Sequence, residues 1–166
     1  MSIHSDVNIE SKIEILTIKL QIRKLKSIVI SCIYRPKFNV SKSDLCELEN
    51  IFNALIECRL KFYACGDYNL HLEDFGNSQI KKFNSLLNRL YLKELINAPT
   101  RGTAQLDLIV SNDLELVTDS SVICSMSDHD AIFIIRRSKP KRPKKLISCR
   151  KFSNINWDLF GHECFR

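Results

Sequence analysis

The sequence has no long hydrophobic run, no Cys-x-x-Cys pair and no internal repeat. No apolar run approaches the length of a membrane span, and the first ten residues are polar, without the apolar core of a signal peptide. We therefore expect an intracellular protein, nuclear or cytoplasmic, with no membrane partner. The seven cysteines are scattered and odd in number, which argues against a disulfide framework and against a zinc ribbon. Three of them lie in apolar runs and are predicted to be small buried side chains: Cys32, Cys65 and Cys124.

The composition is that of one ordinary globular domain. The 166 residues are 45% hydrophobic and 27% charged, so the chain is long enough to form a core. The net charge of +6 and the isoelectric point near 9.0 favour a polyanionic partner, either nucleic acid or an acidic membrane surface.

Residues 61–70 hold the most informative pattern, a short apolar run followed by Gly66, Asp67, Tyr68 and Asn69. The run predicts a buried strand, and the glycine permits a sharp exit of the backbone. Residues i and i+2 of an extended backbone face the same side, so Asp67 and Asn69 are predicted to point together into one cleft. Such a pair suits a metal or phosphate site. An Asx-type turn, in which both side chains only cap local backbone groups, is the alternative.

The remaining apolar periodicities predict strands and helices along the chain. Residues 12–34 alternate with period two, which predicts two antiparallel strands joined by a polar, basic connection at 21–26. A helix is predicted at 44–57, beginning at Asp44, with Glu47 completing a capping box. A second amphipathic helix is predicted at 78–90, and further strands at 92–96, 106–110 and 131–135. This order indicates an α/β layered fold.

Polar residues recur where the predicted strands begin or end. Pro36 ends the strand before it and holds Tyr34 and Arg35 at the strand tip. The alternative for these two residues is a partly buried aromatic ring and a solvated arginine. Asp107 lies in a strand so apolar that its carboxylate needs a partner, unless it faces solvent on an edge strand. His129 is the natural partner, because a carboxylate bonded to an imidazole favours the charged, phosphate-binding form of the ring.

Four motifs therefore follow one another: Tyr34-Arg35-Pro36, Gly66-Asp67-Tyr68-Asn69, Leu106-Asp107-Leu108-Ile109 and Ser127-Asp128-His129. Together they resemble the C-terminal portion of the endonuclease/exonuclease/phosphatase superfamily, above all the apurinic-type endonuclease domain of non-LTR retrotransposon polyproteins. The resemblance covers residues 13–137. It implies an α/β (α+β) fold, a two-layer β-sandwich with flanking helices of the deoxyribonuclease I-like type, here N-terminally truncated.

The resemblance also implies a role in phosphodiester cleavage for residues of each motif. Asp67 would orient or deprotonate the attacking water, and Asn69 would hold that water and a phosphate oxygen. His129, paired with Asp107, would bind the scissile phosphate. Tyr34 would contact the phosphate or the leaving oxygen.

The same resemblance implies a metal ion and DNA contacts. Asp128 and Asp67 would lie in the shell of a Mg²⁺ or Mn²⁺ ion, and Arg35 and Arg101 would touch neighbouring backbone phosphates of DNA. Members of the superfamily also carry an asparagine and a glutamate, the chief metal ligand, on earlier strands, and the polar lead at 1–12 offers no match. We therefore expect an incomplete metal site, weak or no activity of this chain alone, and an exposed sheet face that a partner chain covers.

The function that the resemblance implies is metal-dependent nicking of DNA for target-primed reverse transcription by a retroelement-derived endonuclease. The alternatives are a non-catalytic module that binds nucleic acid or another protein, and another phosphoesterase of the superfamily, acting on phosphoinositides, sphingomyelin or poly(A) tails. Residues 138–166 are predicted to be a basic linker and a tail, because the proline-containing basic run at 139–145 cannot form a core element. A nuclear-import signal or a phosphate-contacting tail is the alternative for that run.

Overall fold

The strand pair predicted near the start of the chain is present. The computed structural model describes residues 13–21, 25–36, 39–123 and 127–138. Strands β1 (Glu14–Leu20) and β2 (Ile28–Tyr34) run antiparallel. Along β2, every second residue is buried, as expected for a strand with two different faces.

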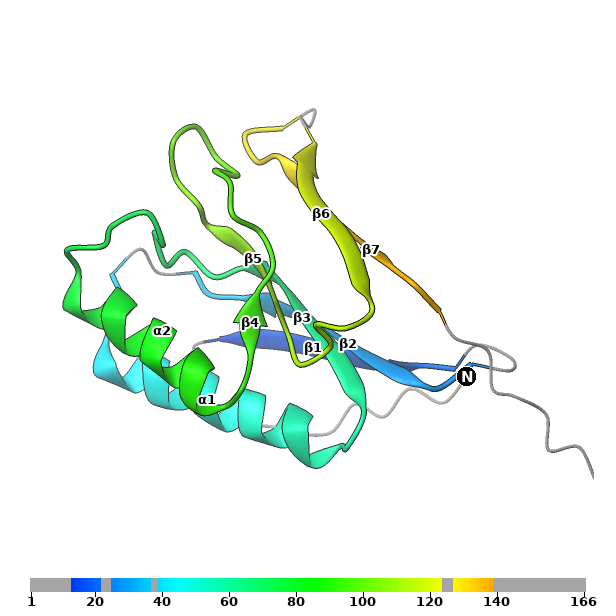
Figure 1. The fold of residues 1–166 in the computed structure, drawn as a ribbon. Helices are drawn as coiled ribbons and strands as arrows, with labels where there is room; N and C mark the ends of the chain where they lie inside the picture. The colour runs from blue at the N-terminus through cyan, green and yellow to red at the C-terminus, as the bar shows by residue number, and fades with distance from the viewer. Residues whose placement is uncertain (1–12, 22–24, 37–38, 124–126, 139–166) are drawn as a thin grey trace, which may run out of the picture.

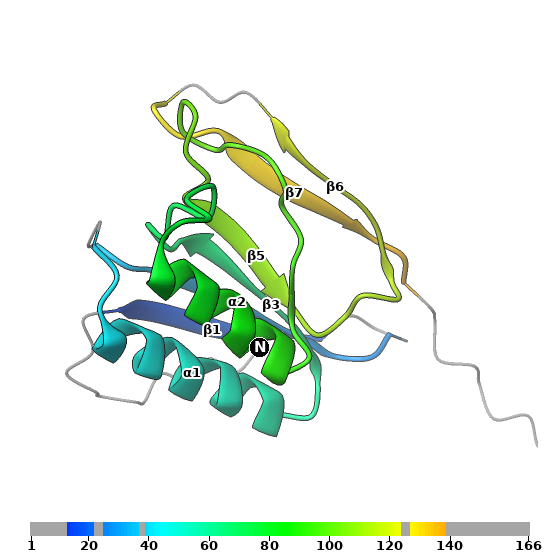
Figure 2. The same ribbon diagram turned by 60° about the vertical axis from the view of Figure 1, so that its left-hand side comes forward.

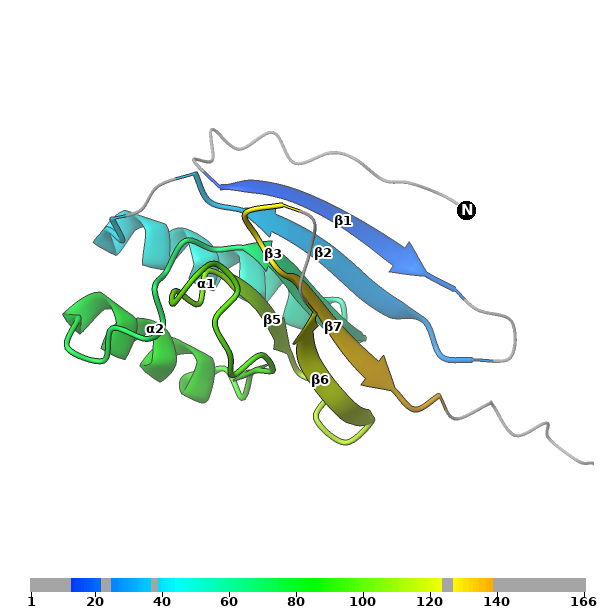
Figure 3. The same ribbon diagram turned by 90° about the horizontal axis from the view of Figure 1, so that it is seen from above.

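The larger sheet has the strand order β1-β2-β3-β5-β4, and Figure 3 shows β1 and β2 side by side with β3 next to β2. Strand β3 (Lys61–Asp67) is parallel to β2, whereas β5 (Asp107–Ser111) is antiparallel to β3. The short β4 (Lys93–Glu94) pairs with β5 and forms one edge, and β1 forms the other. The predicted strands are thus confirmed, and β3 extends into the Gly-Asp motif at its end.

Two helices, α1 (Lys42–Glu57) and α2 (Ser78–Arg89), lie side by side on one face of this sheet (Figure 2). The predicted start of α1 is wrong: the capping box consists of Ser41 and Asp44, not of Asp44 and Glu47. Ser41 Oγ accepts the N–H of Asp44, and the Asp44 carboxylate accepts the N–H of Ser41. The sequence holds two overlapping boxes, and the buried position of Asp44 favours the earlier one.

The main hydrophobic core lies between the larger sheet and the two helices. Phe52 of α1 and Phe83 of α2 are fully buried, as are Phe62 of β3 and Leu108 of β5. Helix stripes of the kind that the sequence predicts therefore pack on the central strands. This packing fixes β3 in the middle of the sheet and so determines where its last residues lie.

The second sheet consists of β6 (Val117–Ile123) and β7 (Ala131–Arg136), an antiparallel pair on the side of the larger sheet away from the helices (Figure 1). A smaller apolar cluster joins the two sheets, with Tyr63 and Ile109 packed against Val122 and Ile132. The fold is therefore the predicted one: two packed β-sheets with helices on the outer face of the larger sheet.

The two sheets leave an open space along β2. A cavity of about 510 Å³ lies there, lined mostly by apolar residues of β2, β3, β5 and β7. Cys32, on this face of β2, is exposed, so the prediction that it is buried is wrong; Cys65 is half-buried. The apolar run around Cys32 would be buried only beneath a further layer, and the described residues supply none. Strand β1 is exposed along its whole length, with Leu16 at 62%.

Several predictions fall on residues that the structure does not describe. They concern the polar lead at 1–12, Cys124, and the linker and tail, of which only Ser138 is described. Neither described helix is both long and apolar enough to span a bilayer.

Candidate functional site

The strand register places three of the predicted site residues in one row across the ends of neighbouring strands. Strands β2 and β3 run parallel and finish side by side, where Tyr34 is the Cα partner of Asp67. Strand β5 begins there, and Asp67 is in turn the partner of Asp107. Paired residues on neighbouring strands project from the same face of a sheet. Tyr34, which is 44% exposed, lies at the open end of this row.

Gly66 allows β3 to approach β2 closely just before Asp67. Its φ is +141°, and a Cβ atom added to it would overlap the carbonyl oxygen of Ile33. Any L-amino acid with a side chain would therefore meet backbone atoms and a strained conformation at this position. The glycine is required by close strand packing as well as by the turn that follows.

Asp67 and Asn69 form an Asx turn and also share one site. The Asn69 N–H donates to Asp67 Oδ1 and its Nδ2 donates to Asp67 Oδ2, both at 3.0 Å. The φ of Asn69 is +48°, a left-handed conformation that asparagine tolerates. The prediction that the two side chains lie together is confirmed, but the extended backbone on which it was based is wrong. The two alternatives for this motif are therefore not exclusive, because the turn itself brings the side chains together.

The surroundings of Asp67 raise the pKa of its carboxyl group. Partial burial is the largest cause, and the negative charge of Asp107 also raises it. The hydrogen bonds from Asn69 and the charge of His129 act in the opposite direction. A carboxylate with a raised pKa is a stronger base, which suits it to accept a proton from a bound water.

The predicted pairing of Asp107 with His129 is confirmed. His129 Nδ1 lies 2.8 Å from Asp107 Oδ2, and neither side chain is more than 26% exposed. The hydrogen bond to Asp107 raises the pKa of His129, and the charge of Asp67 raises it further. The ring therefore carries more positive charge near neutral pH than an isolated histidine does, which suits it to bind a phosphate oxygen.

Thr100 positions both members of this pair, and the sequence analysis missed it. Its buried hydroxyl oxygen accepts the N–H groups of Leu106, at 3.1 Å, and Asp107, at 3.0 Å. Its carbonyl oxygen accepts the N–H of Asp130 at 2.7 Å, in the segment that carries His129. A threonine in the loop before an apolar strand is too common a feature to have revealed this role.

Arg35 is not exposed for contact with DNA phosphates, so that prediction is corrected. Its side chain is 1% exposed. Its Nε donates to the carbonyl oxygen of Tyr68 at 2.7 Å, and its Nη2 donates to that of Asn69. Its Nη1 forms a buried ion pair with Asp44 at 3.3 Å. Arg35 therefore fixes the turn that carries Asp67 against the start of α1.

Arg101 and Asp128 form an ion pair beside the site. Arg101 Nη2 lies 2.6 Å from Asp128 Oδ2, and both side chains are exposed. Asp128, expected in a metal shell, is thus bonded to a cationic side chain. An exposed ion pair contributes little to stability, so a backbone phosphate can compete for Arg101 at small cost.

The described residues do not assemble a metal site by themselves. Within the four described ranges, no group of three or more His, Cys, Asp or Glu side chains is arranged to hold a metal ion. The carboxylates of Asp67, Asp107 and Asp128 are each bonded to a protein donor. Mg²⁺ requires near-octahedral oxygen coordination. These residues therefore do not fit a Mg²⁺ or Mn²⁺ ion without ligands from elsewhere.

Solved structures of other proteins share this fold. The endonuclease domain of TRAS1, a telomere-specific non-LTR retrotransposon, matches with a TM-score of 0.57 and 19% identity, over 74% of this chain and 63% of that one. An endonuclease/exonuclease/phosphatase family protein from Leptotrichia buccalis C-1013-b matches with a TM-score of 0.58 and 17% identity, over 74% of this chain and 53% of that one. A functionally unknown conserved protein from Enterococcus faecalis V583 matches with a TM-score of 0.56 and 11% identity, over 75% and 56%. The chain thus spans 53% to 63% of the length of these proteins. No protein-family model and no curated protein matches the sequence.

Proposed function

Because the chain has the deoxyribonuclease I-like fold of the TRAS1 endonuclease domain, we propose that it is the C-terminal portion of a retroelement-derived, metal-dependent endonuclease. The proposed reaction is the nicking of DNA for target-primed reverse transcription. The observation that carries the proposal is the row of Tyr34, Asp67 and Asp107, with Asn69 and His129 hydrogen-bonded to it. The net charge of +6 supports DNA as the substrate.

In the proposed reaction, Asp67 orients the attacking water and accepts its proton, which its raised pKa favours. His129, whose pKa the hydrogen bond to Asp107 raises, binds the scissile phosphate and stabilises the charge that develops on it. Tyr34, exposed beside Asp67, contacts the phosphate or the leaving oxygen.

The side-chain amide nitrogen of Asn69 is already engaged in hydrogen bonds within the protein. Its Nδ2 donates both to Asp67 Oδ2, at 3.0 Å, and to the carbonyl oxygen of Arg35, at 2.8 Å. An amide nitrogen has two hydrogens, so both are already used. Asn69 therefore orients the Asp67 carboxylate and does not donate to a phosphate oxygen.

A divalent cation would neutralise charge on the phosphate in this reaction. Its remaining ligands would come from outside the described residues, which hold no metal-binding group of three. This chain alone is therefore expected to have weak or no nuclease activity.

Nicking of a supercoiled plasmid by the purified chain, with Mg²⁺ or Mn²⁺, tests the proposal. The informative variants are Asp67→Ala and His129→Ala. The matched controls, Asp74→Ala and His71→Ala, change the same residue types in the loop before α2. Residual nicking that only the first pair abolishes would establish the enzyme. Nicking that persists in Asp67→Ala and His129→Ala would exclude this site as its source.

A non-catalytic nucleic-acid-binding module is the second candidate function. It is favoured by the engagement of Asp128 with Arg101 and by the lack of a metal-holding cluster in the described part of the chain. On this hypothesis the chain binds DNA in a salt-sensitive manner and does not nick it. Arg101→Ala should then weaken DNA binding, whereas Asp67→Ala should not. DNA affinity that neither salt nor Arg101→Ala changes would exclude it.

A further part of the proposal is a partner chain that covers the exposed sheet. The apolar cavity between the sheets and the exposed Leu16 on β1 support it, because an apolar face with an open edge strand favours pairing with another chain. Sedimentation across a range of concentrations, with an apolar fluorescent dye, measures this tendency. A monomer that binds no dye and unfolds in one cooperative thermal transition would count against it.

A further inference from the structure

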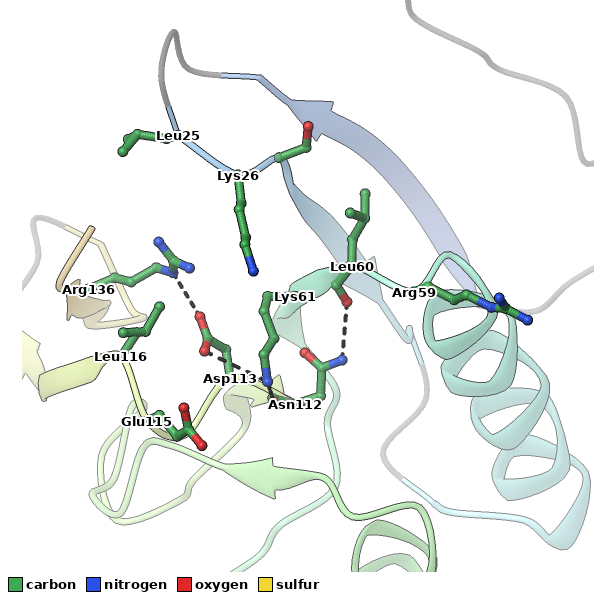
Figure 4. A pocket seen from close by; sticks show the side chains of 11 residues that line it. Leu25, Lys26, Arg59, Leu60, Lys61, Asn112, Asp113, Glu115, Leu116 and Arg136 are labelled. Carbon is green, nitrogen blue, oxygen red and sulfur yellow. Dashed lines mark hydrogen bonds and ion pairs between the residues drawn. The ribbon is translucent and has the colours of Figure 1, made fainter. Parts of the chain in front are cut away.

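Figure 4 shows a second cavity, which is lined by Lys61 at the start of β3, whereas Asp67 is at the other end of that strand. The volume of this cavity is about 710 Å³, within the range of small-molecule sites. Lys61, which lines it, is the first residue of β3, and Asp67 is the last residue of that strand. A strand of seven residues separates its two ends by roughly 20 Å. The cavity is therefore distinct from the candidate nuclease site.

Four segments that are distant in the sequence build this cavity. They are the residues before β2, the turn between α1 and β3, the turn between β5 and β6, and the end of β7. Four cationic side chains and two carboxylates line the cavity: Lys26, Arg59, Lys61 and Arg136, with Asp113 and Glu115. The cavity thus has an excess of positive charge, which attracts anions.

Asp113 is held in place at the base of this cluster by burial and by hydrogen bonds. It is completely buried, and its Oδ2 accepts hydrogen bonds from the Tyr63 hydroxyl and from Arg136 Nε, both at 2.8 Å. Its Oδ1 accepts no hydrogen bond from the described residues. Lys61 Nζ lies 3.9 Å from that oxygen, within ion-pair distance but too far for a hydrogen bond. Asp113 therefore orients Arg136 and neutralises only part of the positive charge.

The cationic side chains that line the cavity have further N–H donors available to a ligand. Arg136 Nε donates to Asp113 Oδ2, the Tyr63 hydroxyl also interacts with the guanidinium, and a guanidinium has five N–H donors in all. Lys61 donates to the carbonyl oxygen of Asn112 at 2.7 Å, and an ammonium group has two further donors. In Figure 4 the Lys26 ammonium extends toward the space between Arg136 and Lys61, whereas Arg59 extends away from it.

We propose that this cavity binds a phosphate group through Lys26, Lys61 and Arg136. Phosphate oxygens accept several charge-assisted hydrogen bonds at once, and two ammonium groups with one guanidinium supply such donors from three directions. Cations that converge without full compensation repel one another, so an anion between them is stabilising. The buried Asp113 Oδ1 offers an acceptor to a water that accompanies the phosphate. Binding here is independent of cleavage at Asp67.

Calorimetric titration of the full chain with inorganic pyrophosphate tests the site. The variant is the double substitution Lys26→Gln and Lys61→Gln, and the matched control is Lys81→Gln with Lys82→Gln, an equal charge change on exposed positions of α2. Removing two charged donors should lower the affinity of the first variant about tenfold or more, whereas the control should stay within about twofold. An equal loss in both variants overturns the proposal, because binding would then reflect net charge.

A parallel titration with a single-stranded oligonucleotide that lacks terminal phosphates distinguishes two sources of the phosphate. If the first variant loses affinity for both probes, the site accepts free phosphate compounds and the nucleic-acid backbone. If it loses affinity for only one probe, that probe identifies the source. If it loses affinity for neither, the proposal is overturned.

Amide shift mapping of the unaltered chain with pyrophosphate provides a measurement that requires no substitution. Shifts should cluster at Lys26, Lys61, Asn112 and Arg136. Shifts confined to the opposite end of the sheet, around Asp67, would overturn the proposal even if the double variant failed to fold.

Discussion

Asp67 and Asp107 are direct cross-strand partners in the β3–β5 ladder, so two carboxylates lie side by side on one face of the sheet. His129 offsets their repulsion, because it hydrogen-bonds to Asp107 and its charge lowers the pKa of Asp67. Like-charged neighbours on adjacent strands destabilise a sheet unless a cation lies close by. The titrations of Asp67 and His129 are therefore expected to be coupled.

The substitution Asp107→Asn should lower the pKa of His129 toward its ordinary value of about 6.5. The reason is that the hydrogen bond to Asp107 is the largest cause of the elevated pKa. An NMR titration of the ring protons measures the change. Asp119→Asn, which alters an exposed carboxylate of β6, is the control and should have no effect. A pKa that is the same with and without the Asp107 carboxylate would contradict the pairing.

The same pair should make stability depend on pH. A histidine whose pKa is higher in the folded chain contributes its full stabilisation below the unfolded pKa of about 6.5, and this contribution is lost as the pH rises through the folded pKa. The pKa of His129 is raised on folding. His129→Gln should therefore destabilise the chain more at pH 5.5 than at pH 8.5, as measured by urea unfolding. Equal losses at the two pH values would show that the charge on His129 does not contribute.

Removal of the Arg35 guanidinium should destabilise the fold strongly. Arg35→Met leaves Asp44 as a buried, unpaired carboxylate, which costs about 3–5 kcal/mol of unfolding free energy. Arg89→Met is the control, because Arg89 pairs with Glu49 at 3.0 Å while its own side chain is 62% exposed. The control should lose less than about 1 kcal/mol. Similar losses in the two variants, measured by urea denaturation, would refute a buried structural role for Arg35.

Substitutions at Thr100 should distinguish the effect of its hydroxyl group from the effect of its side-chain volume. Thr100→Val leaves the N–H groups of Leu106 and Asp107 without an acceptor, at a cost of about 1–3 kcal/mol. Thr100→Ser keeps the oxygen and should lose less. The pKa of His129 should fall in the valine variant and stay raised in the serine variant. If serine and valine gave the same pKa, Thr100 would not position the pair.

Within the described part of the chain, the two glycines with positive φ should differ in their tolerance of alanine. Gly66→Ala introduces overlap with the Ile33 carbonyl as well as backbone strain, and should cost about 3 kcal/mol or more. Gly102 has a φ of +61° but no atom within 4 Å of an added Cβ. Gly102→Ala should therefore cost only about 1–2 kcal/mol, from the conformation alone. Urea unfolding of both variants compares the two costs, and equal losses would mean that strand packing at Gly66 adds nothing.

Properties that follow from local patterns could be predicted from the sequence. Period-two and helical spacing of apolar residues predicts the strands and helices, because burial in this fold follows that spacing. The Asp107–His129 hydrogen bond could be predicted because a carboxylate in an apolar strand requires a partner. The spacing argument needs only neighbouring residues, whereas the pairing relies on a general rule about buried charge and joins residues 22 positions apart.

Properties that depend on distant contacts could not be predicted in this way. Arg35 is buried because carbonyl oxygens of Tyr68 and Asn69 and the carboxylate of Asp44 surround it, and none of these contacts has a sequence pattern. The role of Thr100 depends on the path of two loops. Cys32 lies in an apolar run and was expected to be buried, but exposure depends on what covers a strand and not on the strand alone.

The cysteines that line the cavity between the sheets can report, by their reactivity, whether the cavity is occupied. Cys32 and Cys65 line that cavity, whereas Cys46 lies on α1 and Cys58 at its C-cap, away from it. A thiol reagent followed by peptide mass mapping would therefore read out, cysteine by cysteine, whether the space between the sheets is open. Any segment or protein that fills the space would slow labelling at Cys32 and leave Cys46 and Cys58 as internal standards, so the search for a binding partner needs no engineered label.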